Sequence, residues 1–209
     1  DSLLVVDKPH FLTTAPVGNY VEQTLLRRLQ RRLNLPELTP VHRLDRLTAG
    51  VLLFCKLPEQ RDLYQALFRN QQVDRLYEAL APALPQLEFP LTRRSRIVRD
   101  DKYFFRSCEV AGEPNSETCI EVLQTGDAYW HYRLRPTTGH KHQLRVHMNA
   151  LGAPILGDDF YPCPAQRAAD DFSQPLQLLA RSLTFTDPLG GEVFHFESSR
   201  CLQLDNDKK

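Results

Sequence analysis

The sequence of 209 residues has none of the patterns by which secreted, membrane-spanning or zinc-ribbon proteins are usually recognised. Its five cysteines are odd in number and form no Cys-x-x-Cys pair, which argues against a disulfide framework and for a reducing compartment. No charged-then-apolar leader and no apolar run of spanning length is present. We therefore expect a cytoplasmic protein with no membrane partner.

Motifs of common hydrolases, phosphate-binding proteins and metalloproteases are also missing. The sequence has no Gly-x-Ser-x-Gly elbow and no glycine-rich phosphate loop of either standard type. His140, His142 and His147 lie close together, but they form no His-Glu-x-x-His pattern and have no nearby carboxylate to complete a ligand set. We therefore expect no metal site and interpret these histidines as surface or core residues.

Net charge is zero, with 26 basic and 26 acidic side chains, which alone would argue against a nucleic-acid partner. The distribution is uneven, because residues 158–209 carry 9 acidic and 5 basic groups and residues 1–157 carry 17 acidic and 21 basic groups. Two basic clusters stand out, namely Arg27, Arg28, Arg31 and Arg32, and Arg93, Arg94, Arg96 and Arg99. They fit a phosphate-binding face, and they fit equally well a solvated helix face followed by a charged loop.

Apolar periodicity predicts an α+β fold with a mixed, mostly antiparallel central sheet flanked by helices and loops, in a single domain over residues 1–209. The expected strands cover residues 3–6, 51–56, 75–81, 118–124, 129–135, 181–186 and 192–197, the last two as a terminal hairpin. The expected helices cover about 20–33, 59–70 and 141–151, the last capped by Gly152. The first has Val21, Leu25, Leu29 and Leu33 as its apolar stripe, and the second has Leu63, Ala66 and Leu67 on its inward face. Residues 82–100 fit an exposed loop or short strands. Because the first strand begins so early, we expect natural sequence to precede it.

The stretch from His42 to Gly50 combines charge with a buried strand that follows directly. Asp45 lies between Arg43 and Arg46. A nearby opposite charge favours the ionised form of a carboxylate, which a catalytic carboxylate inside a pocket requires. A turn residue beside surface arginines would give the same pattern, so both interpretations stay open.

Two later stretches add groups that suit chemistry on a nucleobase. Tyr77 offers a flat face on which a base can stack and a hydroxyl that can act in proton transfer. On the predicted helix 141–151, Lys141 and Arg145 are four residues apart and share a face. Arg145 is a natural partner for Asp45, because its planar guanidinium matches a carboxylate bidentately.

These stretches resemble a known family. His42-Arg43-Leu44-Asp45 with Thr48 and Gly50 is similar to the HRLDxxTSG motif of RluA-type pseudouridine synthases. The other similarities follow in the family's order over roughly residues 3–197: Asp7-Lys8-Pro9 with NKP, Arg75-x-Tyr77-x-Ala79 with KxYxA, Gly139 to His147 with GRTHQIRVH, Leu151 to Asp158 with LGHPILGD, and the terminal hairpin with LxFxHPxTGE. Ala49, Arg75, His140 and Lys141 depart from the usual residues, and the S4-type RNA-binding domain of many relatives is absent from this chain.

The resemblance implies the pseudouridine synthase fold and the isomerisation of uridine to pseudouridine in RNA, with an essential aspartate and no cofactor or metal. It assigns the catalytic role to Asp45, with Tyr77, Arg145 and Arg43 as active-site support, and the target base must leave the stack. We expect Arg145→Met to cost activity more than stability. The candidate RNA contacts are His42, Arg46, Lys141, His142, Gln143, Arg27, Arg28, Arg31 and Arg32.

Several alternatives stay open at this point. Asp45 would either attack the sugar or abstract a sugar proton to form a glycal. A non-catalytic RNA-binding module of the same fold has no need of Asp45, Tyr77 and Arg145 together. A hydrolase of the glycosidic bond would need a second carboxylate, and none lies near Asp45 in the sequence. The expected partner is an rRNA or tRNA stem-loop, bound by a monomer.

Overall fold

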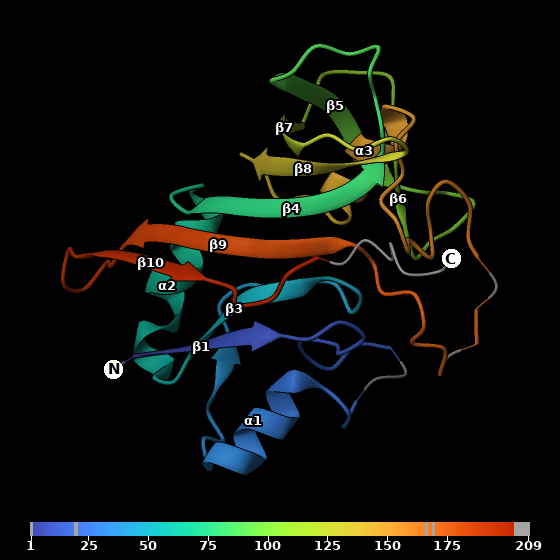
Figure 1. The fold of residues 1–209 in the computed structure, drawn as a ribbon. Coiled ribbons are helices and arrows are strands. Elements are labelled where there is room, and N and C mark those ends of the chain that lie inside the picture. Colours follow the sequence, from blue (N-terminus) through green and yellow to red (C-terminus); the bar gives the residue numbers. More distant parts are fainter. Residues whose placement is uncertain (1, 19–20, 166, 169, 203–209) are drawn as a thin grey trace. The chain divides into compact units, whose positions relative to one another are not determined.

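The computed structural model describes residues 2–18, 21–165, 167–168 and 170–202, and the chain divides into two compact units (Figure 1). Unit 1 comprises Asp1–Arg75 and Ala180–Arg200, and unit 2 comprises Leu76–Leu179 and Cys201–Lys209. Each unit has its own antiparallel strand pairings, so the α+β class is confirmed. The expectation of one catalytic domain over the whole chain stays a prediction.

The sheet of unit 1 is built around β3 (Ala49–Cys55), whose seven residues are all buried. β1 (Leu3–Lys8) pairs with β3 in antiparallel register, and β2 (Thr39–Pro40) pairs with its last two residues. β9 (Leu178–Thr186) follows β3 in the strand order, and β10 (Val193–Glu197) pairs with β9 as the expected terminal hairpin. A strand that is apolar on both faces fits a central position, as its unbroken run of apolar residues predicts.

Gly50 explains why the sequence needs a glycine where the Asp45 loop enters β3. Its backbone has a φ of +113°, and a Cβ there would lie 2.2 Å from the carbonyl oxygen of Ala180 in β9. A side chain would therefore collide with backbone, which cannot move aside as a flexible side chain can.

The helices of unit 1 are shorter than the sequence pattern predicts. α1 (Leu25–Leu33) begins where the Thr24 hydroxyl accepts a hydrogen bond from the Arg27 N–H, five residues after the predicted start. Of the expected apolar stripe only Leu25 is buried, whereas Val21 and Leu33 are exposed. The predicted first residue, at position 20, lies outside the described residues.

α2 (Arg61–Arg69) follows a short 3₁₀ turn (Pro58–Gln60) and contributes to a hydrophobic core of unit 1. Leu67 is buried as expected, but Leu63 is exposed and Tyr64 takes the inward position instead. The core cluster contains Val41, Val51, Leu53, Cys55, Tyr64, Leu67, Val73, Leu183 and Phe185. The Tyr64 hydroxyl reaches Asp187 at 2.8 Å, which satisfies its polar end.

The sheet of unit 2 has the strand order β4-β8-β7-β5-β6, with antiparallel pairing between neighbours. The bounds are β4 (Asp74–Pro82), β5 (Leu91–Arg99), β6 (Ser107–Val110), β7 (Ser116–Gln124) and β8 (Tyr129–Pro136). The predicted strands at 75–81, 118–124 and 129–135 are confirmed. Residues 91–99 form one long strand rather than a loop, because their arginines bind glutamates on neighbouring strands.

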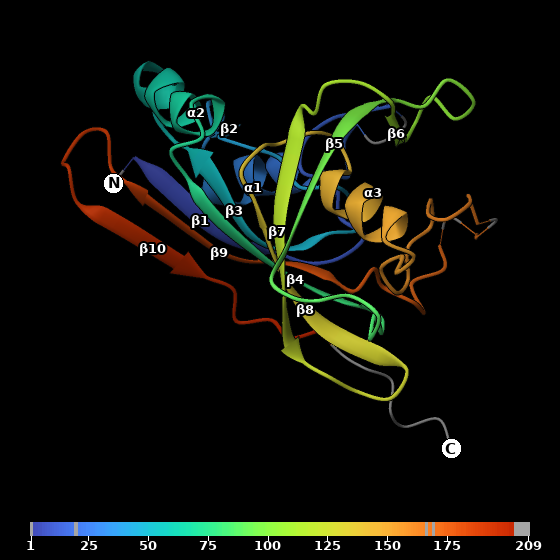
Figure 2. The ribbon, with the colours of Figure 1, turned by 90° about the horizontal axis from the view of Figure 1, so that it is seen from above.

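α3 (Gln143–Ala150) packs against unit 2's sheet at β6 and β7 (Figure 2). It begins two residues later than predicted, because His142 has a φ of +58°. The expectation that Lys141 and Arg145 share a helix face is therefore wrong, since Lys141 precedes the helix. Residues 143–148 are buried around the whole helix, which leaves no exposed stripe.

All five cysteines lie in the described part of the chain and are free thiols. Within the same residues, no helix has the length and apolar character that crossing a membrane requires.

Candidate active site

The backbone of the Asp45 loop is held at every carbonyl oxygen from Leu44 to Leu47. The Thr14 hydroxyl donates to the Leu44 carbonyl at 2.8 Å and accepts from the Leu44 N–H at 3.3 Å. The Asp45 carbonyl accepts from the N–H of Thr48 at 3.2 Å, which closes the turn into β3. Asp45 is half-buried, and the backbone polar groups before and after it are hydrogen-bonded, which fixes the part of the loop that bears its carboxylate.

Lys8 is a fully buried lysine that supports this loop from the end of β1. Its ammonium donates to the carbonyl oxygens of Pro9 at 2.9 Å, Leu12 at 2.8 Å and Arg46 at 3.2 Å. Burial lowers the pKa of Lys8 from 10.5 to about 7, and the charge of nearby Asp45 acts in the opposite direction. The three carbonyl oxygens match the three N–H groups of an ammonium, so these hydrogen bonds favour the charged form and oppose the effect of burial.

His10 holds the last carbonyl of the loop. Its Nδ1 lies 2.6 Å from the carbonyl oxygen of Leu47, and since a carbonyl only accepts, Nδ1 carries the proton. Burial lowers the pKa of His10, which favours the neutral ring. The guanidinium of Arg46 lies over the ring of Phe11, 5.6 Å from its centroid. Residues 8–14 therefore form a brace along the loop, and the arrangement presents Asp45 in a fixed position.

His42 holds the start of the loop from inside unit 1. Its Nε2 accepts a hydrogen bond from the Leu53 N–H at 3.2 Å, and its ring stacks on Phe68 at 4.4 Å. Burial, helped by the charge of Arg75, lowers the pKa of His42 to about 3, so the ring is neutral. This geometry gives His42 a structural role, and its predicted RNA contact stays a prediction. Arg43, the next residue, is exposed.

In unit 2, Arg145 forms a buried ion pair that sequence reasoning missed. Its Nε and Nη2 donate to the two carboxylate oxygens of Asp158 at 2.7 and 2.6 Å, and both side chains are almost completely buried. The guanidinium also lies 4.9 Å from the ring centroid of Phe160 and 5.4 Å from that of Tyr161. Asp158 in turn accepts the backbone N–H groups of these two residues. These contacts hold the side chain of Arg145 in one orientation, at the junction of α3 and the 155–161 loop. Its expected pairing with Asp45 stays a prediction.

The other predicted site residues of unit 2 differ in exposure. Tyr77 is half-buried in β4, opposite Leu134 of β8. Lys141 is exposed, whereas His142 and Gln143 are buried. The Gln143 amide bonds to Thr138, His140, Glu117 and Thr118, and His142 lies 3.2 Å from the Tyr161 hydroxyl. The bonds of Gln143 and His142 give both a structural role, and the RNA contacts expected of Lys141, His142 and Gln143 stay predictions.

The arginines of α1 are exposed and partly engaged with neighbours. Arg31 pairs with Glu22, Arg28 donates to Gln23 at 3.0 Å, and Arg27 donates to Gln30 at 3.1 Å. These exposed bonds are weak enough for a phosphate to displace. The RNA contacts of Arg27, Arg28, Arg31 and Arg32 stay predictions.

The three histidines of the sequence cluster lie in different surroundings, with His140 exposed and His142 and His147 buried. Among the described residues, no three His, Cys, Asp or Glu side chains gather as potential ligands. His147 is buried, with Nδ1 2.9 Å from the Thr118 hydroxyl and Nε2 3.1 Å from the hydroxyls of Ser95 and Ser116. Burial lowers the pKa of His147 to about 4, so it acts as a neutral hydrogen-bonding core residue, as the sequence interpretation allowed.

Lys8, Thr14 and Asp158 are the supporting residues that sequence reasoning did not single out. Lys8 and Asp158 lie inside motifs that the resemblance quotes, so their position in a motif was the available signal. Lys8 also ends an apolar strand, where a lysine is unusual unless its charge finds partners. No sequence pattern indicated Thr14, because a hydroxyl that bonds to the backbone of a distant residue has no characteristic spacing in the sequence.

A family model described as RNA pseudouridylate synthase matches residues 2–150. The dual-specificity RNA pseudouridine synthase RluA of Escherichia coli O157:H7 is 35% identical over 206 residues, which cover 95% of this chain and 89% of that protein. Pseudouridylate synthase RPUSD2 of Homo sapiens is 33% identical over 161 residues, covering 77% of this chain and 29% of that protein, so the match spans under a third of it.

A solved structure titled Human RNA Pseudouridylate Synthase Domain Containing 1 superposes with a TM-score of 0.77 at 27% identity, over 95% of this chain and 80% of that one. Human RNA Pseudouridylate Synthase Domain Containing 4 superposes with a TM-score of 0.73 at 26% identity, over 97% and 86%. The predicted fold is therefore confirmed. Since the family model and RluA each match most of the sequence, the chain belongs to the RluA-type RNA pseudouridylate synthases, a family of RNA-modifying isomerases.

Proposed function

We propose that the chain isomerises uridine to pseudouridine in ribosomal or transfer RNA, with Asp45 as the essential carboxylate and with the target base flipped out of the stack. The observation that carries this proposal is the braced loop around Asp45. Catalytic groups must be held within about 0.5 Å of their working position by their supporting residues. A carboxylate whose neighbouring carbonyl groups are all bonded meets that requirement, whereas a solvated turn has no need of a buried lysine beneath it.

The reaction balances without a co-reactant. The bond between N1 of uracil and C1′ of ribose breaks, the base rotates, and a bond between C5 and C1′ forms. The proton on C5 leaves to a base or to water, and N1 gains a proton. Because nothing is oxidised or reduced, we further propose that the protein needs no cofactor. In line with the expectations from the sequence, we also propose that it needs no metal and acts as a cytoplasmic monomer.

Asp45 would work by attack on C1′ or by removal of a sugar proton to form a glycal. In both routes the carboxylate acts on the sugar, so both routes depend on its placement by the loop that Thr14, Lys8 and His10 hold. Tyr77 would stack on the flipped uracil and take part in removal of the C5 proton. Arg145 and Arg43 complete the proposed active-site support, Arg145 as a buried and oriented cation and Arg43 as an exposed one.

The relatives suggest the substrate class. The RluA proteins are named as dual-specificity RNA pseudouridine synthases, and their match covers most of this chain. We propose an rRNA or tRNA stem-loop as substrate, because flipping a base costs least where it is already unstacked in a loop.

Tritium release tests this function. Transcripts of tRNA and rRNA carrying uridine labelled at C5 are incubated with wild type, with Asp45→Asn, and with Asp62→Asn as the control. Asp62 is an exposed aspartate that pairs with Arg69 on α2, so its replacement removes the same charge away from the loop. We expect release by wild type and by Asp62→Asn, and none by Asp45→Asn, which should still bind the RNA.

Three other results would contradict the proposal. Turnover retained by Asp45→Asn would remove this residue from the chemistry. RNA binding without release by any of the three proteins would favour a binding module of the same fold. Appearance of free uracil instead of pseudouridine would identify a hydrolase.

A further inference from the structure

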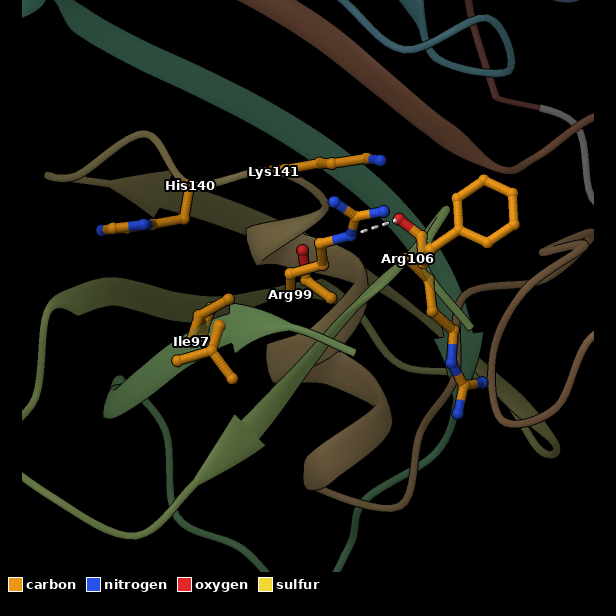
Figure 3. Close-up of a pocket in the computed structure, with 8 residues that line it drawn as sticks. Ile97, Arg99, Arg106, His140 and Lys141 are labelled. Atoms are coloured by element: carbon orange, nitrogen blue, oxygen red, sulfur yellow. Dashed lines mark hydrogen bonds between the residues drawn. The ribbon is translucent and has the colours of Figure 1, made fainter. Parts of the chain in front are cut away.

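Unit 2 contains a second place suited to RNA, on the surface formed by β5, the loop after it and the segment before α3. A pocket of about 420 Å³ opens there, lined among others by Ile97, Arg99, Phe104, Arg106, His140 and Lys141 (Figure 3). Its volume falls within the range of about 300–1,000 Å³ that small-ligand pockets show. All of these residues belong to unit 2.

Two of the pocket's cations have no acidic partner. Three arginines nearby are neutralised, since Arg93 pairs with Glu109, Arg94 with Glu117 and Arg106 with Asp100. In contrast, neither Arg99 nor Lys141 forms an ion pair with any carboxylate that the structure describes.

Figure 3 shows the side chains of Arg99 and Lys141 extending in the same direction, while those of His140 and Arg106 extend away on other sides. Both cations are exposed and line one pocket. Two adjacent positive charges without counter-charges repel each other, and a bound anion would relieve that repulsion.

An exposed aromatic ring completes the pocket. Phe104 is 69% exposed, far more than a core phenylalanine. Arg99 Nε donates to the Phe104 carbonyl at 3.1 Å, and its guanidinium carbon lies 5.7 Å from the Phe104 ring centroid. The bond through Nε does not use the two terminal nitrogens of Arg99, whose four N–H groups can donate to an anion.

The loop that carries Phe104 is firmly built. Asp100 accepts from the backbone N–H groups of Lys102 and Tyr103 and from Arg106 Nε, the last at 2.6 Å. Arg106 also donates to the Phe160 carbonyl at 2.9 Å. The exposure of Phe104 is therefore a property of an ordered loop, which presents the ring beside the two cations.

We propose that this pocket binds one nucleotide of a single-stranded part of the RNA, with the base stacked on Phe104 and the adjoining phosphate held by Arg99 and Lys141. The inference rests on the proposed function, because it takes RNA as the substrate. An aromatic face beside cations is how proteins hold single strands, whereas a base within a duplex has no free face to offer. The arginine's planar guanidinium suits a phosphate bidentately, and the lysine adds a point charge.

The test separates the phosphate contact from the stacking contact. Binding of oligouridylate is measured at several salt concentrations, all in the Asp45→Asn background so that turnover plays no part. Removing two single-strand phosphate-neutralising charges, in R99M/K141M, should lower the slope of log affinity against log salt by about 1.4, or about 0.7 for each charge. Phe104→Ala should weaken binding about tenfold with the slope unchanged, and Phe104→Trp should restore binding. Arg94→Met is the matched control, because its charge lies on the same strand but is neutralised by Glu117.

The outcomes distinguish this proposal from the function on which it rests. If R99M/K141M and Phe104→Ala both bind oligouridylate like their parent, or change no more than Arg94→Met, the pocket is not a nucleotide site, even if the wild type releases tritium. A parent protein that does not bind oligouridylate at all also overturns the pocket proposal. Absence of tritium release by wild type, with these binding effects present, refutes the proposed catalysis alone. Thermal unfolding of each variant shows whether a loss of binding reflects a loss of structure.

Discussion

Replacing Lys8 by methionine should change how the stability of the protein depends on pH. The folded protein lowers the pKa of Lys8 from 10.5 to about 7, whereas the unfolded chain exposes it to water. Between these values the unfolded state binds more protons than the folded state, so the free energy of unfolding rises with pH. Below about pH 7 both states hold the proton, and the cost of burying the charge is fully present.

The magnitude follows from the size of this window. Integrated from about pH 7 to about pH 9, the proton difference amounts to about 2 kcal/mol of added stability for the wild type. Lys8→Met has no proton to lose at this position and should lack that gain. Any other group that titrates over this range does so in both proteins and cancels in the difference.

Urea unfolding followed by circular dichroism at both pH values measures the difference in stability between wild type and Lys8→Met. We expect that difference to shift by about 2 kcal/mol in favour of the wild type on going to the higher pH. Lys102→Met, which replaces an exposed lysine, is the control: it shows how far the stability difference shifts with pH when a solvent-exposed lysine is removed. A shift no larger than that of this control would refute the reasoning, since it would mean that Lys8 keeps its proton in its carbonyl cage throughout.

Arg145→Met should lower the free energy of unfolding by about 3–5 kcal/mol, because it leaves the carboxylate of Asp158 buried without its partner. This revises the expectation from the sequence that activity would suffer more than stability. In urea unfolding, the double variant R145M/D158L should lose less free energy of unfolding than the two single variants together. Folding lowers the pKa of His147 from 6.5 to about 4, so the free energy of unfolding of the wild type should fall by about 3 kcal/mol as the pH drops through this window. His147→Gln should lack this contribution, and its free energy of unfolding should depend less on pH between these values. An unchanged acid slope in the variant would contradict a neutral, buried His147.

The sequence predicts the strands better than the helices, and the structure shows why. β3 is a continuous apolar run, and its full burial follows from that pattern alone. The start of α1 depends on the Thr24 cap rather than on the apolar stripe that extends before it. Residues 91–99 were expected as a loop or short strands because of their charge, but a charged strand is stable when partners on neighbouring strands neutralise it.

The motif around Asp45 could be identified from the sequence, but its brace could not. The bonds that hold the loop join residues 38, 37 and 30 positions apart, at Arg46, Leu47 and Leu44. In each of these hydrogen bonds the acceptor is a backbone carbonyl, which every residue type possesses. No pattern of side chains in the sequence therefore predicts them. The Arg145–Asp158 pair is nearer in sequence, but only the buried setting shows that this carboxylate is the arginine's partner.

The position of β3 between β1 and β9 also has a consequence for synthesis on the ribosome. β1 leaves the ribosome before β3 and can pair with it at once, whereas β9 follows only after nearly all of unit 2 has been translated. Until then most of one edge of a wholly apolar strand lacks a neighbour, since β2 pairs only with its last two residues, and such an edge readily recruits other chains. The collision that a side chain at Gly50 would suffer with Ala180 also arises only at this last step. The nascent protein thus holds Asp45 on an unfinished sheet for most of its translation, and its need for chaperones should be greatest in that interval.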